Sequence, residues 1–449
     1  MLDSRAASPS TASHLWYPMA HPAEMLAHPP IVLAKAEGVM LEDQTGHRSL
    51  DAVGGLWCVN LGHSCEPVKD AIREQLDILP FFNAFRGTSN EPAIDLAAKL
   101  AEFFRPEGLT RAFFTSGGSD SVDTALRLAR QYHKIRGQHD RVKFISLKKA
   151  YHGTHFGGAS VNGNANFRRN YEPLLPGCFH IPCPWPYRNP FNETDPQRLA
   201  ELCAALLEDE IKFQGADTVA AFIMEPVLGA GGVIPPHDSF MPMVKDICTR
   251  HGILLIADEV ITGFGRAGAP TGSRLYGVQP DLLCTAKALT NGYFPLGVVM
   301  IAEQVAQAFE SNKDSFGAIG SGYTYSAHPV GAAAGLAALE QIEKLQVWVN
   351  AAERGGELLT SLRQLQQEYA IVGDVRGRGL MACLELVEDR ASKTPIAKER
   401  INRVFAQTYR SGVMVRISGN CVIVSPPLVI SAADVQTIAA ALARGLAAA

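Results

Sequence analysis

Four short segments of the sequence place residues capable of chemistry directly after apolar runs. Thr115–Asp120 (TSGGSD) contains two glycines after AFFT, Tyr151 comes shortly after VKFISL, Asp258 follows ILLIA, and Lys287 follows LLCT. Glycines at a helix start allow backbone N–H groups to surround a phosphate, and a lysine is seldom buried without a specific reason. Because open α/β sheets bind their ligands at strand ends, we expect these four features to meet in one site.

Each of the four features also has an ordinary explanation. Ser119 and Asp120 are common helix N-caps, Tyr151 could simply pack, Asp258 could pair with a structural arginine, and Lys287 could extend its amine to solvent. Together, however, a reactive lysine, a carboxylate for a pyridinium nitrogen, an aromatic ring and a phosphate cup are what pyridoxal phosphate requires. The combination therefore predicts a pyridoxal phosphate site, and no metal centre is expected.

The order of these features resembles that of the class III, fold-type I aminotransferases. LLIADEVITGFGRAG, followed by CTAKALTNGYFPLG, is similar to the signature of that family. GYTYSAHP (322–329), VRGRGL (375–380) and SPPLVI (425–430) resemble further family segments in the expected order. The resemblance extends from about His14 to the C-terminus, and it implies a transaminase that uses pyridoxal phosphate.

The resemblance implies roles for the residues around the cofactor ring. Lys287 is expected to hold the cofactor covalently and to move a proton during the reaction, and Asp258 to pair with the ring nitrogen. An opposite charge within hydrogen-bonding reach shifts a pKa by about 1–3 units. Such a shift is enough to keep the ring nitrogen protonated. Tyr151 matches the aromatic residue on one face of the ring and Val260 the aliphatic residue on the other.

The family match also implies which residues hold the phosphate and the ring hydroxyl. Gly118 and Ser119 match the phosphate cup, and Thr324 matches a threonine that reaches the phosphate of the neighbouring subunit. Glu225, in MEPV, corresponds to the acidic residue near the cofactor hydroxyl and Asp258. Shared sites of this kind imply a homodimer; the sequence leaves open whether such dimers pair into a homotetramer.

Arg416, in VMVRISG, falls where the family keeps an arginine that grips the substrate carboxylate. A planar guanidinium suits bidentate carboxylate recognition better than a lysine does. Ornithine and γ-aminobutyrate members carry an acidic residue that neutralises this arginine, and a glutamine after the DE pair. This chain has Ala230 and Ile261 at those positions, so the match with those two groups fails there.

The segment GLWCVN instead resembles the ω-amino acid:pyruvate and amine:pyruvate transaminases. In that group Trp57 would line the substrate pocket together with Phe85 of the partner chain. Met19 lies where some members have a further aromatic residue, which would make the pocket wider here. For each of these side chains plain core packing is the alternative.

The leading prediction is therefore transfer of an amino group from an ω-amino acid or primary amine to pyruvate, which gives alanine and an aldehyde or ketone. A nearer alternative is the diaminopelargonate-forming aminotransferase of biotin synthesis, whose N-terminal H-x-W-x-P element is similar to 14–18. A second alternative is an aminomutase or racemase on the same scaffold. A cofactor-sensing regulator would need a DNA-binding element, which the sequence lacks.

Composition excludes several other classes of protein. The 449 residues include 41 Lys+Arg and 45 Asp+Glu, so the formal net charge is −4. This charge creates no positive field that would bind nucleic acid or an anionic membrane. No apolar run approaches the roughly 18 residues of a membrane span, and the first residues do not resemble a secretory signal. Nine cysteines without C-x-x-C are typical of buried thiols in a reducing compartment, so a cytoplasmic location is expected.

Apolar runs and helical periodicity alternate over residues 80–310, which predicts a doubly wound, mostly parallel α/β sheet. After about residue 328 the pattern changes to a smaller α+β domain, completed by a hairpin from the N-terminal segment. The predicted division is 1–60 and 329–449 for the small domain and 61–328 for the large one. The Pro-rich segment 181–190 (IPCPWPYRNP) is expected at the surface or rim. The expected strands are Ala112–Thr115, Val142–Leu147, Val219–Met224, Ile253–Ala257, Leu282–Thr285 and Leu296–Ile301.

Overall fold

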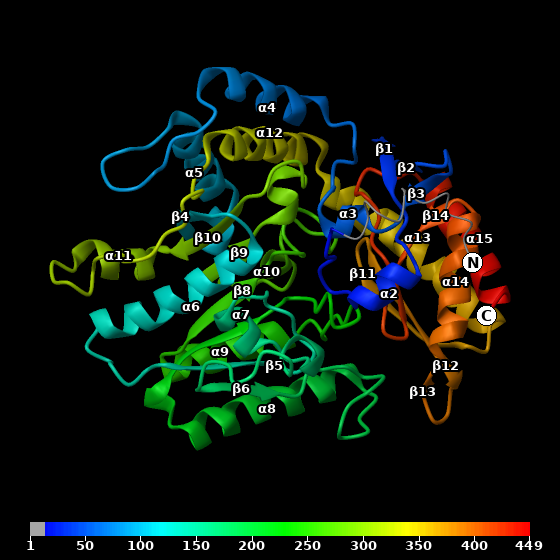
Figure 1. The fold of residues 1–449 in the computed structure, drawn as a ribbon. Helices are drawn as coiled ribbons and strands as arrows, with labels where there is room; N and C mark the ends of the chain where they lie inside the picture. The colour runs from blue at the N-terminus through cyan, green and yellow to red at the C-terminus, as the bar shows by residue number, and fades with distance from the viewer. Residues whose placement is uncertain (1–13) are drawn as a thin grey trace.

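A seven-stranded sheet forms the centre of the larger part of the molecule, which a computed structural model describes over residues 14–449 (Figure 1). Its order is β4-β10-β9-β8-β7-β5-β6, and β10 is the strand that runs antiparallel to its neighbours. The predicted strands are all present, whereas β6 was missed. The strands are β4 (Leu109–Thr115), β5 (Lys143–Leu147), β6 (Cys178–Ile181), β7 (Val219–Met224), β8 (Leu254–Asp258), β9 (Leu282–Thr285) and β10 (Gly297–Ala302).

The central strands are apolar throughout because both faces of the sheet are covered. Along β7 every residue is buried, and Phe222 and Met224 belong to one core cluster while Ala221 and Ile223 belong to another. Helix α6 (Gly118–Ile135) supplies the second cluster, and α8 (Pro196–Gln214) and α9 (Phe240–His251) supply the first. Two cores on opposite faces define the doubly wound arrangement that the sequence predicted.

The topology gathers the ends of several strands at one edge of the sheet. Because β10 is antiparallel to both β4 and β9, these two strands run in the same direction as β8, β7 and β5. Thr115, Asp258 and Thr285 therefore end their strands on the same side. The short η4 (Lys287–Thr290) begins directly after β9, and Lys287 adopts a left-handed backbone with φ 50°.

Two further sheets form the smaller part, to which both ends of the chain contribute. In the first, β14 of the C-terminal region pairs in parallel with β3 of the N-terminal region. This confirms a smaller α+β unit built from both termini, while the exact domain bounds remain a prediction. The strands are β1 (Leu33–Glu37), β2 (Met40–Asp43), β3 (Arg48–Asp51) and β14 (Val413–Met414) in one sheet, and β11 (Val372–Arg378), β12 (Met381–Asp389), β13 (Thr394–Pro395), β15 (Arg416–Ser418) and β16 (Cys421–Val424) in the other.

Helices surround both parts, and the Ala-rich α12 (Pro329–Leu345) packs on α4 (Glu66–Ile78) and α5 (Glu91–Phe103) at the top of Figure 1. None of the helices within 14–449 combines the length and apolar character needed to cross a membrane. The remaining elements are α2 (Pro22–Ala27), α3 (Gly54–Trp57), η1 (Arg105–Glu107), α7 (Phe156–Val161), η2 (Ala165–Phe167), η3 (Ala216–Thr218), α10 (Gly272–Leu275), α11 (Glu303–Ser311), α13 (Val347–Glu368), α14 (Lys398–Arg410) and α15 (Ala432–Ala447).

The Pro-rich segment 181–190 differs from its prediction. Cys183, Pro184 and Trp185 are buried, and only Pro190 at its end is exposed. The reason is that Trp185 lies against two cations: the Lys149 amine is 5.4 Å and the Arg376 guanidinium 4.8 Å from its ring centre. The middle of the segment is thus buried rather than lying on the surface, whereas Pro182 and residues 186–189 are half-buried.

Candidate active site

Asp258, at the end of β8, is a buried carboxylate with a defined orientation. Its Oδ2 lies 2.8 Å from Nδ1 of His152, and its Oδ1 accepts the Val260 N–H at 3.1 Å. His152 is itself buried, and its second ring nitrogen, Nε2, has no hydrogen-bond partner among residues 14–449. The histidine therefore fixes the carboxylate from one side.

Lys287 lies on the same cavity as Asp258. Burial lowers the pKa of its amine, while the neighbouring Cys58, Asp258 and Glu225 partly oppose that change. A lowered pKa increases the share of uncharged amine, which is the form that can attack a carbonyl. The place of Lys287 on the cavity, together with the direction of this pKa shift, suits covalent attachment of an aldehyde cofactor.

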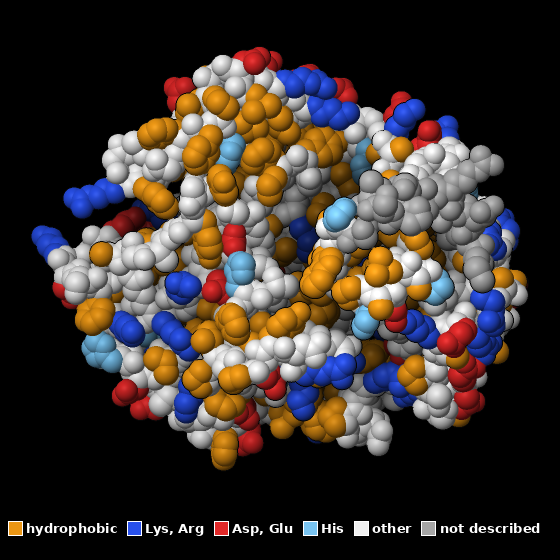
Figure 2. Space-filling view, in the orientation of Figure 1, with side chains coloured by type: hydrophobic (Ala, Val, Ile, Leu, Met, Phe, Trp, Pro, Cys, Tyr) orange, Lys and Arg blue, Asp and Glu red, His pale blue; other side chains and the backbone are white. Residues whose placement is uncertain are grey.

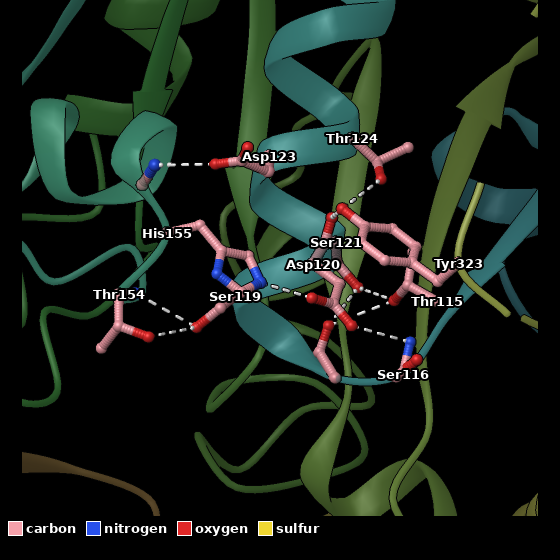
Figure 3. Close-up of polar contacts among 12 residues, drawn as sticks. Thr115, Ser116, Ser119, Asp120, Ser121, Asp123, Thr124, Thr154, His155 and Tyr323 are labelled. Carbon is pink, nitrogen blue, oxygen red and sulfur yellow. Dashed lines mark hydrogen bonds and ion pairs between the residues drawn. The ribbon is translucent and has the colours of Figure 1, made fainter. Parts of the chain in front are cut away.

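The end of β4 and the first turn of α6 are joined by a network of polar contacts at the predicted phosphate cup (Figure 3). Ser119 Oγ accepts the Thr154 N–H at 3.2 Å, and Asp120 accepts the Ser116 N–H at 3.0 Å. A side chain at Gly118 would lie 2.9 Å from Val260, so glycine keeps this approach open. The start of the long helix α6 faces the same place, where partial positive charge favours an anion.

Glu225 follows β7 and is the second buried carboxyl of the site. Its Oε1 accepts the Tyr151 N–H at 3.0 Å and its Oε2 the Gly229 N–H at 2.8 Å. Burial raises the pKa of this carboxyl to about 7; His152 opposes the rise and Asp258 adds to it. Its contacts hold the segment that carries Tyr151 in place.

These residues enclose one cavity of about 160 Å³. The cavity combines an oriented carboxylate, a lysine amine, a glycine-rich helix start and an aromatic ring, which fits the groups of pyridoxal phosphate. Asp258 would pair with the ring nitrogen, Lys287 with the aldehyde carbon, and Gly118 and Ser119 with the phosphate. Its lining comprises Gly118, Ser119, Val122, Tyr151, His152, Gly153, Glu225, Asp258, Val260, Ile261 and Lys287.

Arg416, at the start of β15, lies close enough to the cavity for its charge to act on both Tyr151 and Lys287. Its side chain is half-buried, and burial lowers the pKa of its guanidinium. No carboxylate within residues 14–449 forms an ion pair with it, and it does not itself line the cavity. The site thus holds a guanidinium whose hydrogen-bonding capacity is available to a ligand.

Besides Arg416, four predicted residues are not part of the lining of this cavity. Trp57 is buried in the core with 2% exposure, whereas Phe85, Met19 and Thr324 are exposed. The Phe85 ring lies beside Gly322, so it shares a surface with the segment that carries Thr324. Their predicted roles in lining the pocket or serving a partner subunit remain predictions.

Sequence reasoning missed the roles of His152 and Cys58. The histidine was visible in the YHG segment, but its partner Asp258 is distant in the chain, so no local spacing indicated the pair. Cys58 follows Trp57 in GLWCVN; burial raises the pKa of its thiol, and the charge of Lys287 opposes that rise.

Residues 22–446 match the model of the aminotransferase class-III family. The fold is similar to an amine transaminase from an uncultivated Pseudomonas species, solved with bound PLP: the TM-score is 0.95 and identity 44%, over 96% of this chain and 98% of that one. An omega-aminotransferase of Caulobacter vibrioides is 37% identical over 96% of both chains. A putrescine–pyruvate aminotransferase of Pseudomonas aeruginosa is 36% identical over 91% of this chain and 88% of its own.

The chain belongs to the class-III aminotransferases, and its large domain has the fold of the type I pyridoxal phosphate enzymes. It is therefore a transferase that uses pyridoxal phosphate, and its ω-transaminase relatives place it among enzymes that act on amines and keto acids.

Proposed function

We propose that the enzyme transfers the amino group of an ω-amino acid or a primary amine to pyruvate. The observation that carries this proposal is the half-buried Arg416 guanidinium, which has no carboxylate partner among the described residues. A guanidinium in this state favours a small ligand that brings its own carboxylate. The pyruvate acceptor named for the Pseudomonas aeruginosa relative is consistent with this choice.

In this proposal, each residue of the site has a separate role in the reaction. When bound, the cofactor supplies an electron sink for the carbanion chemistry of amino-group transfer. Lys287 moves the proton at the reacting carbon, Asp258 stabilises positive charge at the ring nitrogen, and Tyr151 covers one face of the ring. Arg416, whose charge acts on Tyr151, holds the carboxylate of pyruvate.

The test is a screen of amine donors with pyruvate as acceptor, with alanine formation as the measured product. Alanine must appear with at least one ω-amino acid or carboxylate-free amine, and no turnover should occur without a keto acid. Turnover without a keto acid would favour an aminomutase or racemase. Activity confined to adenosylmethionine as donor would favour the diaminopelargonate-forming reaction.

We also propose a homodimer in which each chain completes the other's site. Hydrophobic side chains gather on the face over α4 and α5 (Figure 2). At the end of α4 and in the segment that joins it to α5, Ile78 is 77%, Phe82 50% and Phe85 47% exposed. Phe81 continues this surface towards Tyr325, whose ring centre is 5.6 Å away. An apolar surface of this kind marks an association site, and a second copy would place Phe85 and Thr324 near the partner's cavity.

Subunit mixing tests this sharing. A heterodimer of Lys287→Ala with Thr324→Asp should regain up to half the wild-type activity, since one of its two sites has every intact residue. Lys287→Ala mixed with Asp258→Asn is the control: both residues serve their own chain, so neither site is repaired. If subunit exchange is demonstrated and the mixture of Lys287→Ala with Thr324→Asp regains no more activity than the control mixture, Thr324 does not contribute to the partner's site.

The expected setting of the enzyme is the cytoplasm. All nine cysteines are free, and six of them are buried, which suits a reducing compartment.

A further inference from the structure

Glu385, on β12, lies at the junction of three parts of the chain that surround the site. Its side chain is 1% exposed, and it pairs with Arg188 at 2.6 Å and with Arg376 at 2.8 Å. Arg188 comes from the Pro-rich segment 181–190, and Arg376 comes from β11. A buried carboxylate is stabilised only when such partners neutralise it, so this cluster, Arg188–Arg376–Glu385, acts as one unit.

The cluster also reaches the hairpin that carries Arg416. Asn420, in the turn between β15 and β16, donates from Nδ2 to Glu385 Oε1 at 3.3 Å and to the Leu386 carbonyl at 3.0 Å. In the sheet, Glu385 is opposite Cys421, and Arg416 is opposite Ile423 on the other edge of β16. The turn of the hairpin that carries Arg416 is therefore held directly by Glu385.

The other side of the cluster is attached to the cofactor cavity. Arg376 donates from Nε to the Gly232 carbonyl at 2.8 Å, close in sequence to Gly229, whose N–H binds Glu225. Its guanidinium and the Lys149 amine both contact the Trp185 ring, and Lys149 is two residues before Tyr151. The cluster thus connects the hairpin of Arg416 with the segments that form the cavity wall.

We propose that Arg188, through Glu385 and Asn420, is a positioning residue that sets the place of Arg416 and thereby controls recognition of the substrate carboxylate. The inference rests on the proposed function, in which Arg416 holds that carboxylate. Arg188 has no contact with the cavity itself: its guanidinium binds Glu385 and the Lys393 carbonyl at 2.5 Å. A change at Arg188 should therefore alter binding of carboxylate substrates without altering the reacting groups.

The test compares Arg188→Met with a matched control, Arg274→Met. Arg274 also pairs with a buried glutamate, Glu107, at 2.8 Å, and both pairs have side-chain exposures of 29% and 1%. Arg188→Met should raise the KM for pyruvate about tenfold with kcat changed less than twofold, since one carboxylate contact is misplaced. The KM of a carboxylate-free amine found in the donor screen should change less than twofold, and Arg188→Lys should recover part of the pyruvate effect.

A double variant shows whether Arg188 acts through Arg416. On an Arg416→Ala background, Arg188→Met should have no further effect on the pyruvate KM, because coupled residues are not additive. Asn420→Asp, which places a second carboxylate beside Glu385, should reproduce the effect and serves if Arg188→Met does not fold.

Equal KM changes for both substrates, or a pyruvate effect of Arg274→Met equal to that of Arg188→Met, would overturn the inference. So would an additive double variant. If Arg416→Ala itself leaves the pyruvate KM unchanged, the proposed function fails first, and the two failures are thereby told apart.

Discussion

The cofactor side and the substrate side of the site are built in different ways. Asp258 and Lys287 follow buried strands of the central sheet, and Asp258 is fixed by contacts to His152 and Val260. Arg416 instead stands on a three-residue strand of the smaller part, and Phe85 is exposed outside the sheet. The residues predicted to hold the cofactor are therefore placed on the central sheet, whereas those predicted to choose the substrate lie outside it.

The largest effect is expected on the cofactor side, from Lys287→Ala. The variant should lose the visible absorbance of the covalently held cofactor and more than about 10³-fold of turnover, since it removes both attachment and proton transfer. Absorbance spectra and single-turnover kinetics measure this. Lys148→Ala, an exposed lysine after β5, is the control and should keep both signals. A borohydride-trapped adduct that persists in Lys287→Ala would contradict the assignment.

Asp258→Asn should be the next most severe change. The amide keeps the shape and a contact to His152 but removes the charge that favours a protonated ring nitrogen, worth about 1.4–4 kcal/mol. Both half-reactions should slow by about 10²-fold or more, to a similar extent, when each is measured separately. A loss confined to one half-reaction would place Asp258 on the substrate side instead.

Arg416→Ala should affect the two half-reactions unequally. Loss of the ion pair should weaken the pyruvate half-reaction by about 2–5 kcal/mol, while deamination of a carboxylate-free amine stays within about tenfold, as the amine makes no such contact. Donors like β-alanine should fall between these limits. Stopped-flow measurement of each half-reaction separates them, and equal losses would show that Arg416 only supports the fold.

The smallest expected effect is on stability, from Glu225→Gln. The carboxyl has an ordinary pKa of 4.5 and a folded pKa of about 7, so the folded state binds a proton that the unfolded state releases between these values. Its stabilising contribution is complete below pH 4.5 and is lost as the pH rises through 7. Glutamine does not titrate. The free energy of unfolding of the variant minus that of wild type should thus increase by about 2 kcal/mol from pH 5 to pH 8.

Denaturant unfolding of the cofactor-free protein at both pH values measures this difference. Glu340→Gln, an exposed glutamate on α12, is the control and should show no such change with pH. If the difference in free energy of unfolding between Glu225→Gln and wild type does not change with pH, the two backbone hydrogen bonds of Glu225 offset the effect of burial on its pKa.

The contrast between the central sheet and the elements outside it also explains how much could be predicted from the sequence. Strands buried on both faces give unbroken apolar runs, so β7, β8 and β9, and the chemical residues after them, were predictable. Strand β6 was missed because CFHI mixes polar with apolar residues and most of it is only half-buried. The burial of Trp185 depends on Lys149 and Arg376, which are distant in the chain, and no local pattern encodes such contacts.

The position of β4 has a consequence for synthesis of the protein. This strand ends in the phosphate cup but lies at the sheet edge, where its partner is β10, the last strand of that sheet to be made. More than 180 residues separate Thr115 from the end of β10. At roughly 5–20 residues per second, the cup therefore leaves the ribosome roughly 10–40 seconds before its strand can be paired. Nascent chains arrested before β10 has emerged should therefore not retain the cofactor, whereas chains with all of β10 outside the exit tunnel should begin to do so.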